Sequence, residues 1–274
     1  MSRHSAPTKR SKTTADLQKA KQEGRKLSAI TCYDSAFAKL ISRTEVDLVL
    51  VGDSMGNVVL GFDNTIPVTV DMICHHTAAV SRQLAGPLLC ADMPFLSYHQ
   101  SVDQALENAG RMLQQGGAHA VKLEGGQEVV PQVQAMVQAG IPVLGHLGYT
   151  PQSVNVFGGH KVQGREQAAR DKLKEDAIAL QEAGVFAIVF ELIPRQLAAE
   201  VTQSLRVPTI GIGAGPECDG QIIVLHDILG FDDEFQPKFL KKYANLAQVV
   251  TDGVGAYDKE VKSGEYPAPE HCYE

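Results

Sequence analysis

Four acidic residues of this chain, Asp53, Asp92, Glu124 and Glu191, each follow a short apolar segment typical of a strand buried on both faces. In α/β enzymes the carboxyl ends of parallel strands meet on one face of the fold, and the catalytic groups stand there. Carboxylates brought together in this way repel one another unless they are protonated or bridged by a cation. The pattern therefore indicates a site for acid–base or metal chemistry, provided that the strands are parallel neighbours.

Three of these residues form a candidate metal site. Asp53, Asp92 and Glu124 offer only oxygen donors, and no Cys or His spacing typical of zinc accompanies them. Such a set suits Mg²⁺, or Mn²⁺, better than zinc. The alternative is structural, because a carboxylate at a strand end also caps the following helix or pairs with a surface base. For any one of the three residues, the structural role and metal binding explain the position equally well. For all three together, metal binding is the better explanation.

Other polar residues at strand ends suit the binding and activation of an anionic substrate. Lys122 precedes Glu124 by two residues, so both side chains leave their strand on the same face. A lysine inside a barrel needs an anion, which is either a substrate or one of the acids. His146 is a candidate for orienting a substrate oxygen or donating a proton, or it is structural. The apolar neighbours of Glu191 predict a raised pKa, which suits a general base, with a helix cap or an ion pair as the alternative.

A recurring unit of helix, glycine, short apolar strand and polar residue predicts the elements that position these groups. Eight strands are expected, at residues 27–32, 47–52, 88–91, 118–123, 141–145, 185–190, 209–213 and 221–225. Eight βα units in roughly 250 residues match the size of a (β/α)₈ barrel. A doubly wound open sheet is the alternative, but the G-x-G-x-x-G turn that it favours is missing after the first strand.

The domain prediction is a single barrel over residues 14–264, with a short N-terminal helix closing one end. Residues 1–13 are polar, basic and without apolar periodicity, which predicts a disordered tail. Residues 238–262 predict a helix with an apolar stripe, and residues 265–274 a C-terminal tail. The irregular tract at 146–160 is a candidate lid over the active face.

Charge and composition limit the class of protein. The net charge is −7 and the pI is about 5.7, which argues against a nucleic-acid or anionic-membrane surface. No apolar run approaches the roughly 18 residues of a membrane helix, and no signal-peptide core follows the N-terminus. The five cysteines are scattered, odd in number and without C-x-x-C. We therefore expect reduced thiols and a cytoplasmic location.

Several longer motifs resemble the 3-methyl-2-oxobutanoate hydroxymethyltransferase (ketopantoate hydroxymethyltransferase) family. They are VGDSMGNVVLG, ADMPFLSY, VKLEGG, PVLGHLGYTPQSVNVFGG and GIGAG with CDGQIIVLHDILG, in the same order. The resemblance implies a TIM barrel of the phosphoenolpyruvate/pyruvate type, Mg²⁺ and a homodecamer. It also implies transfer of a hydroxymethyl group from 5,10-methylenetetrahydrofolate to 3-methyl-2-oxobutanoate, giving 2-dehydropantoate (ketopantoate) in the first step of pantothenate biosynthesis.

The resemblance also implies roles for individual residues. Those matching the metal site are Asp53, Asp92 and Glu124. Those matching the binding site of the 2-oxo acid are Asp53, Ser54, Asp92, Lys122 and His146. Glu191 matches the catalytic base. Ser54 is not expected to be a nucleophile, because no His–Asp pair that would activate it is evident.

The sequence leaves two competing functions open. The nearest is a Mg²⁺-dependent 2-oxo acid lyase or mutase of the isocitrate lyase type. Lyases of that group typically carry a K-K-C-G-H-like cysteine loop, which this sequence lacks. The other is a non-catalytic barrel that binds a ligand through a metal.

Overall fold

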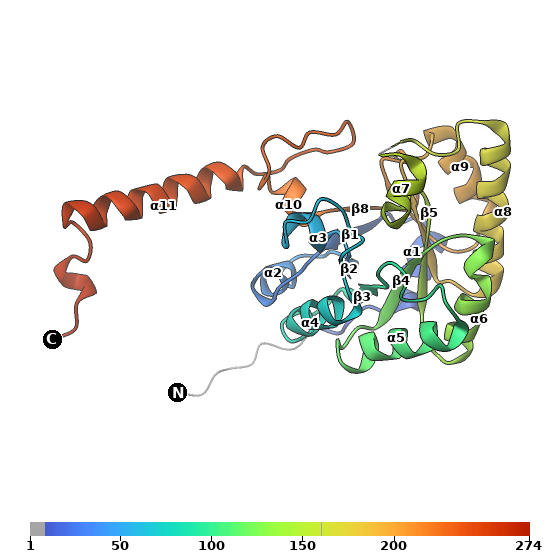
Figure 1. The fold of residues 1–274 in the computed structure, drawn as a ribbon, viewed down its shortest axis with the longest axis horizontal. Helices are drawn as coiled ribbons and strands as arrows, with labels where there is room; N and C mark the ends of the chain where they lie inside the picture. The colour runs from blue at the N-terminus through green and yellow to red at the C-terminus, as the bar shows by residue number, and fades with distance from the viewer. Residues whose placement is uncertain (1–8, 160) are drawn as a thin grey trace. The chain divides into compact units, whose positions relative to one another are not determined.

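The computed structural model describes residues 9–159 and 161–274, and it contains a closed barrel of eight parallel strands in chain order (Figure 1). The strands are β1 (Leu27–Thr31), β2 (Leu48–Val51), β3 (Leu88–Asp92), β4 (Ala120–Glu124), β5 (Val143–Gly148), β6 (Ala187–Glu191), β7 (Thr209–Ile212) and β8 (Gly220–Ile223). β8 pairs with β1 and closes the ring. The predicted (β/α)₈ barrel is confirmed, each strand lies within three residues of its predicted bounds, and the open-sheet alternative is wrong.

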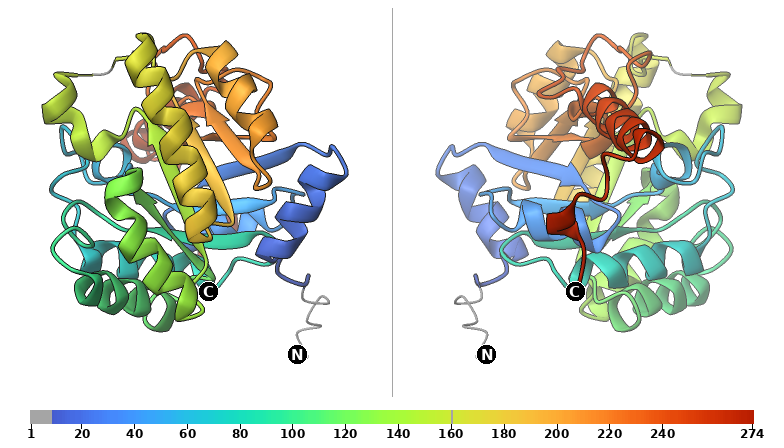
Figure 2. Two further views of the ribbon diagram at one scale, coloured as in Figure 1. Left: turned by 90° about the vertical axis from the view of Figure 1, so that its right-hand side faces the viewer. Right: turned by 90° about the vertical axis from the view of Figure 1, so that its left-hand side faces the viewer.

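Helices cover the outside of the barrel. They are α2 (Ser35–Ile41), α4 (Val70–Ser81), α5 (Val102–Gln114), α6 (Val130–Gln138), α8 (Gln167–Ala183) and α9 (Arg195–Ser204), with short α3 (Met55–Val58), η1 (Gln127–Val129), η2 (Pro151–Ser153) and α7 (Val154–Phe157) in loops. Local sequence explains their ends: the Ser101 side chain caps α5 by accepting from Gln104 N, and Gly184 ends α8 in the left-handed conformation. In Figure 2, α6 and α8 run along the outer surface of the barrel next to each other.

The barrel interior is filled by apolar side chains from the strands and is closed at its N-terminal end by α1 (Thr14–Gln22). Leu17 and Ala20 of α1 are fully buried and belong to the same cluster as Leu27, Leu48 and Leu88. Burying a leucine side chain contributes about 1.5–3 kcal/mol. The predicted closing helix is therefore confirmed. A second cluster lies between the strands and the outer helices.

The N-terminal tail is only partly described. Residues 1–8 of the predicted disordered tail lie outside the described residues. Lys12, in contrast, donates from its backbone N to Gly86 O at 2.7 Å and from Nζ to Asp47 Oδ1 at 2.7 Å. Asp47 is almost fully buried, so this end of the described chain is held against the loops that precede β2 and β3.

Residues 225–274 form a second compact unit. It contains α10 (Leu225–Ile228), α11 (Leu246–Ser263) and η3 (Pro269–His271). The predicted helix at 238–262 begins later than expected, at Leu246, because Asn245 provides the N-cap and accepts from Gln248 N. It ends at the left-handed Gly264. The predicted end of the barrel domain at residue 264 and the predicted C-terminal tail at 265–274 stay predictions.

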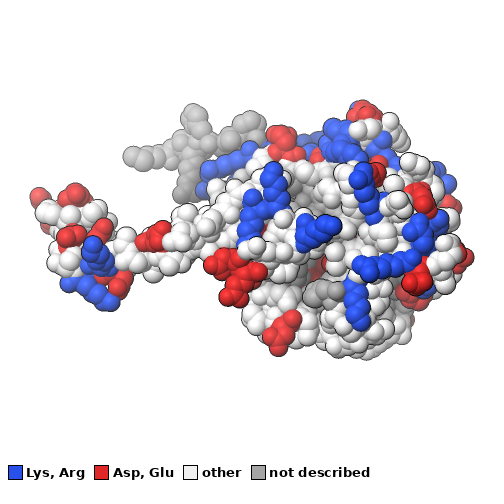
Figure 3. Space-filling model, turned by 90° about the horizontal axis from the view of Figure 1, so that it is seen from above, with Lys and Arg blue, Asp and Glu red and all other residues white. Residues whose placement is uncertain are grey.

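Charged side chains are scattered over the surface. Lys and Arg are interspersed with Asp and Glu on the face drawn in Figure 3. Within residues 9–159 and 161–274, no helix has both the length and the apolar character needed to cross a membrane.

Candidate active site

Polar side chains at the barrel mouth continue the inward-facing positions of the strands. Four strands carry an interior apolar residue and, two positions later, a polar one. The pairs are Cys90 and Asp92 in β3, Ala120 and Lys122 in β4, Leu144 and His146 in β5, and Val189 and Glu191 in β6. Because side chains alternate across a strand, residues two apart share a face. The polar residues therefore point into the carboxyl-terminal mouth of the barrel.

A pocket of about 120 Å³ occupies this mouth. All seven residues singled out from the sequence line it: Asp53, Ser54, Asp92, Lys122, Glu124, His146 and Glu191. Leu50, Val189, Ile212 and Ile222 supply an apolar wall. The structure thus brings the predicted residues together in one small, partly apolar site.

Asp92 and Lys122 form a buried ion pair at the centre of the site. Their strands are in register at these two residues, and Lys122 Nζ lies 2.7 and 2.8 Å from the two carboxylate oxygens of Asp92. Burial alone lowers the pKa of Lys122, but the charges of Asp92, Glu124 and Asp53 outweigh burial and raise it. Lys122 is therefore a charged group in the pocket, and Asp92 is paired with a buried cation instead of a surface base.

Asp53 lies directly against this pair. Its backbone N is 3.3 Å from Asp92 Oδ2. A Cβ at the preceding Gly52 would stand 2.8 Å from Ser54 Oγ, so this glycine leaves room for the Ser54 hydroxyl beside the pair. Burial, followed by the negative charge of Asp92, raises the pKa of Asp53 well above its usual value. A cation between the two carboxylates would relieve this repulsion.

Glu124, His146 and Glu191 form a row on the other side of the pocket. Glu124 Oε1 is 3.4 Å from His146 Nδ1, and His146 Nε2 is 3.3 Å from Glu191 Oε2. Burial, then the charge of Lys122, lowers the pKa of His146. Burial raises the pKa of Glu191, and it raises that of Glu124 to about 8. The row therefore combines a neutral imidazole with two carboxyl groups that hold their protons more firmly than exposed ones do.

The backbone around Glu191 is unusually constrained. Leu192, which follows it, has a φ of 46°, a conformation that costs a non-glycine residue about 1–3 kcal/mol. Gly148 in β5 has a φ of 99°, and a Cβ there would lie 2.2 Å from Glu191 O. Tyr149 N donates to the same carbonyl oxygen at 2.8 Å. These contacts fix the position from which the Glu191 carboxyl group enters the pocket.

Gln152 is a site residue that strand-end positions could not reveal, because it lies in the loop after β5. Its Nε2 donates to Asp53 Oδ2 at 2.9 Å and to Met93 O at 3.0 Å, and its backbone N donates to Glu124 Oε2 at 3.1 Å. Tyr98 OH donates to Gln152 Oε1 at 3.1 Å. Gln152 thus links the carboxyl ends of β2 and β3 through its side-chain amide and that of β4 through its backbone.

The tract that contains Gln152 is less irregular than predicted. β5 extends through Gly148, and η2 and α7 follow; residue 160 lies outside the described residues. Another contact that the sequence did not reveal holds Ser54, whose Oγ is 2.9 Å from Tyr33 OH. Ser54 stands at the N-cap of α3 without a side-chain cap bond, which leaves its hydroxyl facing the pocket.

Removing the Gln152 amide is expected to destabilise the fold. In Gln152→Leu, Asp53 Oδ2 and Met93 O lose a buried donor, and each unsatisfied buried group costs about 1–3 kcal/mol. Urea unfolding should therefore show a free energy of unfolding lower by at least about 1 kcal/mol. Gln134→Leu, on the exposed face of α6, is the matched control. Equal free energies of unfolding for the two variants would show that the Gln152 amide does not stabilise the fold.

The donor set meets the chemical requirements of Mg²⁺. No group of three or more His, Cys, Asp or Glu side chains within the described residues is arranged to enclose a metal. Mg²⁺, however, is usually held by one or two carboxylates together with substrate oxygens and water. Asp53 and Asp92 supply two adjacent buried carboxylates, and the buried Glu124 Oε1 has no hydrogen-bond partner. The residues present therefore fit a two-carboxylate site with a third acid nearby.

The fold is that of a known class of barrels. Phosphonopyruvate hydrolase superposes with a TM-score of 0.60 at 13% identity, covering 94% of this chain and 92% of that chain. The 2,3-dimethylmalate lyase, a PEP mutase/isocitrate lyase superfamily member, superposes with a TM-score of 0.57 at 16% identity, covering 94% and 92%. At such identities the likeness concerns the fold alone. The chain therefore shares its barrel fold with these two enzymes, as the strand pattern predicted.

Sequence comparison identifies the family. The family model for ketopantoate hydroxymethyltransferase matches residues 11–269. The 3-methyl-2-oxobutanoate hydroxymethyltransferases of Moorella thermoacetica and Thermoanaerobacter sp. (strain X514) are 53% and 52% identical over 261 residues. Each alignment covers 95% of this chain, with 97% and 95% of the relatives. The chain belongs to the ketopantoate hydroxymethyltransferase family, and the resemblance of its motifs is confirmed.

Proposed function

We propose that this chain transfers a hydroxymethyl group from 5,10-methylenetetrahydrofolate to 3-methyl-2-oxobutanoate. The products are ketopantoate and tetrahydrofolate, and a water molecule supplies the hydroxyl oxygen. The observation that carries the proposal is the convergence of all seven family-matched side chains on one pocket of about 120 Å³. Membership of a family whose curated relatives bear this activity in their names supports it.

The pocket suits a small branched 2-oxo acid. The buried ammonium of Lys122 offsets the charge of a carboxylate, and the Ser54 hydroxyl and His146 are placed to contact substrate oxygens. The apolar wall that includes Val189 and Ile222 accommodates an isopropyl group. Lys122 is buried and also pairs with Asp92, so its ammonium would serve both that carboxylate and the substrate.

Asp53 and Asp92 are the proposed Mg²⁺ ligands, with Glu124 as the third carboxylate of the site. A metal held there would supply Lewis-acid chemistry to a 2-oxo acid substrate. The raised pKa of Asp53 supports a cation at this position. A structure of phosphonopyruvate hydrolase, which shares the fold, contains oxalate and Mg²⁺.

Glu191 is the proposed base that removes the C3 proton. Its carboxyl group lines the pocket, and burial raises its pKa towards the range in which a base works near neutral pH. His146, 3.3 Å from Glu191 Oε2, orients the carboxyl group and stays neutral because burial lowers its pKa. The resulting enolate carbon is the nucleophile for the one-carbon unit.

A homodecamer in the cytoplasm is the proposed state of the enzyme. The stripe formed by Val250, Val254, Tyr257 and Val261 on α11 supports association, since each of these side chains is 45–62% exposed and the helix has no buried residue. Val254→Glu is expected to lower the mass measured by light scattering, because a charge in a buried interface is unfavourable. Lys259→Glu, outside the stripe, should retain the mass. A decamer that survives Val254→Glu would contradict a role for the stripe.

A turnover assay separates the candidate functions. The purified chain is supplied with Mg²⁺, 3-methyl-2-oxobutanoate and 5,10-methylenetetrahydrofolate, and separately with larger 2-oxo and 2-hydroxy acids that a lyase would cleave. Folate-dependent ketopantoate formation supports the proposal. Carbon–carbon cleavage of another acid would indicate the lyase or mutase alternative, and binding without turnover would indicate a non-catalytic barrel.

A further inference from the structure

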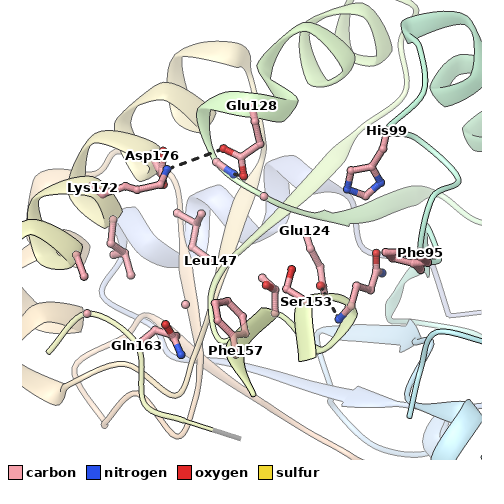
Figure 4. A pocket seen from close by; sticks show the side chains of 18 of the residues that line it. Phe95, His99, Glu124, Glu128, Leu147, Ser153, Phe157, Gln163, Lys172 and Asp176 are labelled. Carbon is pink, nitrogen blue, oxygen red and sulfur yellow. Dashed lines mark hydrogen bonds and ion pairs between the residues drawn. The ribbon is translucent and has the colours of Figure 1, made fainter. Parts of the chain in front are cut away.

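A second, larger cavity adjoins the proposed 2-oxo acid pocket. It has a volume of about 340 Å³ and lies beside the carboxyl ends of β4 and β5, where residues of the loop after β5 and of α8 line it (Figure 4). Glu124 lines both cavities. The roles proposed above for the seven site residues make no use of this space.

A single turn of chain separates the two cavities. In the segment from Thr150 to Ser153, Pro151 lines the smaller pocket, whereas Thr150, Gln152 and Ser153 line the larger one. Glu124 Oε2 accepts from the backbone of this turn, and Oε1 faces His146 in the smaller pocket. Only this turn and Glu124 would therefore separate a molecule in the larger cavity from the 2-oxo acid in the smaller pocket.

The lining of the larger cavity indicates the chemistry of its ligand. Phe95, His99 and Phe157 supply planar rings for stacking. Glu128 and Asp176 add negative charge, and Lys172 is already committed to them: its Nζ lies 2.7 Å from Asp176 Oδ2 and 4.0 Å from Glu128 Oε2, at one corner of the cavity in Figure 4. Such a lining disfavours a phosphate or another anion. It suits a flat, uncharged heterocycle with several N–H donors.

We propose that this cavity binds the reduced pteridine ring of the one-carbon carrier. The ring offers N–H donors to the carboxylates and to the amide of Gln163, and a face to the aromatic side chains. Seated there, it presents its one-carbon unit at the Glu124 side, next to the C3 carbon of the 2-oxo acid. This inference rests on the proposed function and extends it to the site of the second substrate.

Blocking the cavity tests the proposal. Ala169 is an exposed residue of α8 that lines the cavity, so Ala169→Trp fills the space without entering the core. Ala168→Trp, at the neighbouring exposed position outside the lining, is the matched control. Calorimetric titration with tetrahydrofolate should show at least about tenfold weaker binding to Ala169→Trp. Deuterium exchange at C3 of 3-methyl-2-oxobutanoate, measured without folate, should stay at the level of the control.

The two measurements separate failure of this inference from failure of the proposed function. Tetrahydrofolate binding to Ala169→Trp at the control's affinity, with C3 exchange intact, overturns the assignment of the cavity alone. Absence of both C3 exchange and tetrahydrofolate binding in the unmodified chain overturns both proposals. Phe157→Leu is the second variant, since it removes a ring without adding bulk. It should also weaken tetrahydrofolate binding and keep C3 exchange, whereas Val156→Leu on the same short helix, with its side chain 86% exposed, should change neither.

Discussion

Glu191→Gln is expected to bind 3-methyl-2-oxobutanoate and to exchange its C3 proton about 10²–10⁴-fold more slowly than the unmodified chain. The amide keeps the shape of the carboxyl group and its position near His146, but it cannot accept a proton. The measurement is loss of the C3 proton signal by NMR in deuterium oxide with Mg²⁺ and without folate. Glu200→Gln, on the exposed surface of α9, is the control. An unchanged rate of C3 proton exchange in Glu191→Gln would show that Glu191 is not the base.

The pH dependence of the same exchange gives an independent check. Burial raises the pKa of Glu191 in the folded protein, so its carboxyl group takes up a proton at a higher pH than an exposed one does. The base form is lost as the pH falls through this raised pKa. Exchange should therefore decline on the acid side at a pH above 4.5, the ordinary value for glutamate, and the decline should be absent from the residual rate of Glu191→Gln.

Asp92→Asn is expected to abolish the Mg²⁺-dependent binding of the 2-oxo acid. The substitution removes a proposed metal ligand, and its effect should exceed the 10–100-fold typical of residues that only support a ligand. It also removes the charge that pairs with the buried Lys122 at 2.7 Å. Breaking a buried ion pair in this way costs about 3–5 kcal/mol. We therefore expect a lower melting temperature as well.

Calorimetric titration of 3-methyl-2-oxobutanoate, with Mg²⁺ and with a chelator, measures this effect directly. Asp71→Asn is the matched control, because Asp71 is an exposed residue of α4 paired with Arg111 on the surface. Asp92→Asn should bind the 2-oxo acid with the same affinity in Mg²⁺ and in chelator. The control should bind it more tightly in Mg²⁺, as the unmodified chain does. Metal-dependent affinity retained by Asp92→Asn would refute the metal assignment.

The barrel and the main side chains of its mouth were predictable from the sequence because both depend on local patterns. Eight short apolar segments, most of them separated by helices, define the strands. Alternation of side chains then predicts that the polar residues ending β3, β4, β5 and β6 face the barrel interior. Lys122 and Glu124 share a face because they are two apart in β4. The pairing of Asp92 with Lys122 was only one of several possibilities, since it depends on the register between β3 and β4.

The contacts made by loops were not predictable in the same way. Gln152 reaches Asp53 across 99 positions of sequence, and no periodicity marks a loop residue that folds back over the strand ends. The contact between Tyr33 OH and Ser54 Oγ was not predictable for the same reason. The late start of α11 has a local cause, because Asn245 provides a cap that the apolar stripe alone does not reveal.

The fate of a labelled one-carbon unit tests the proposed transfer directly. The chain is incubated with Mg²⁺, 3-methyl-2-oxobutanoate and 5,10-methylenetetrahydrofolate that carries ¹³C in its methylene group, and the products are followed by ¹³C NMR. We expect the label in the hydroxymethyl carbon of ketopantoate, in amounts equal to the tetrahydrofolate released. Label that stays on the folate while the 2-oxo acid is consumed, or no reaction of either substrate, would show that the chain does not carry out this transfer.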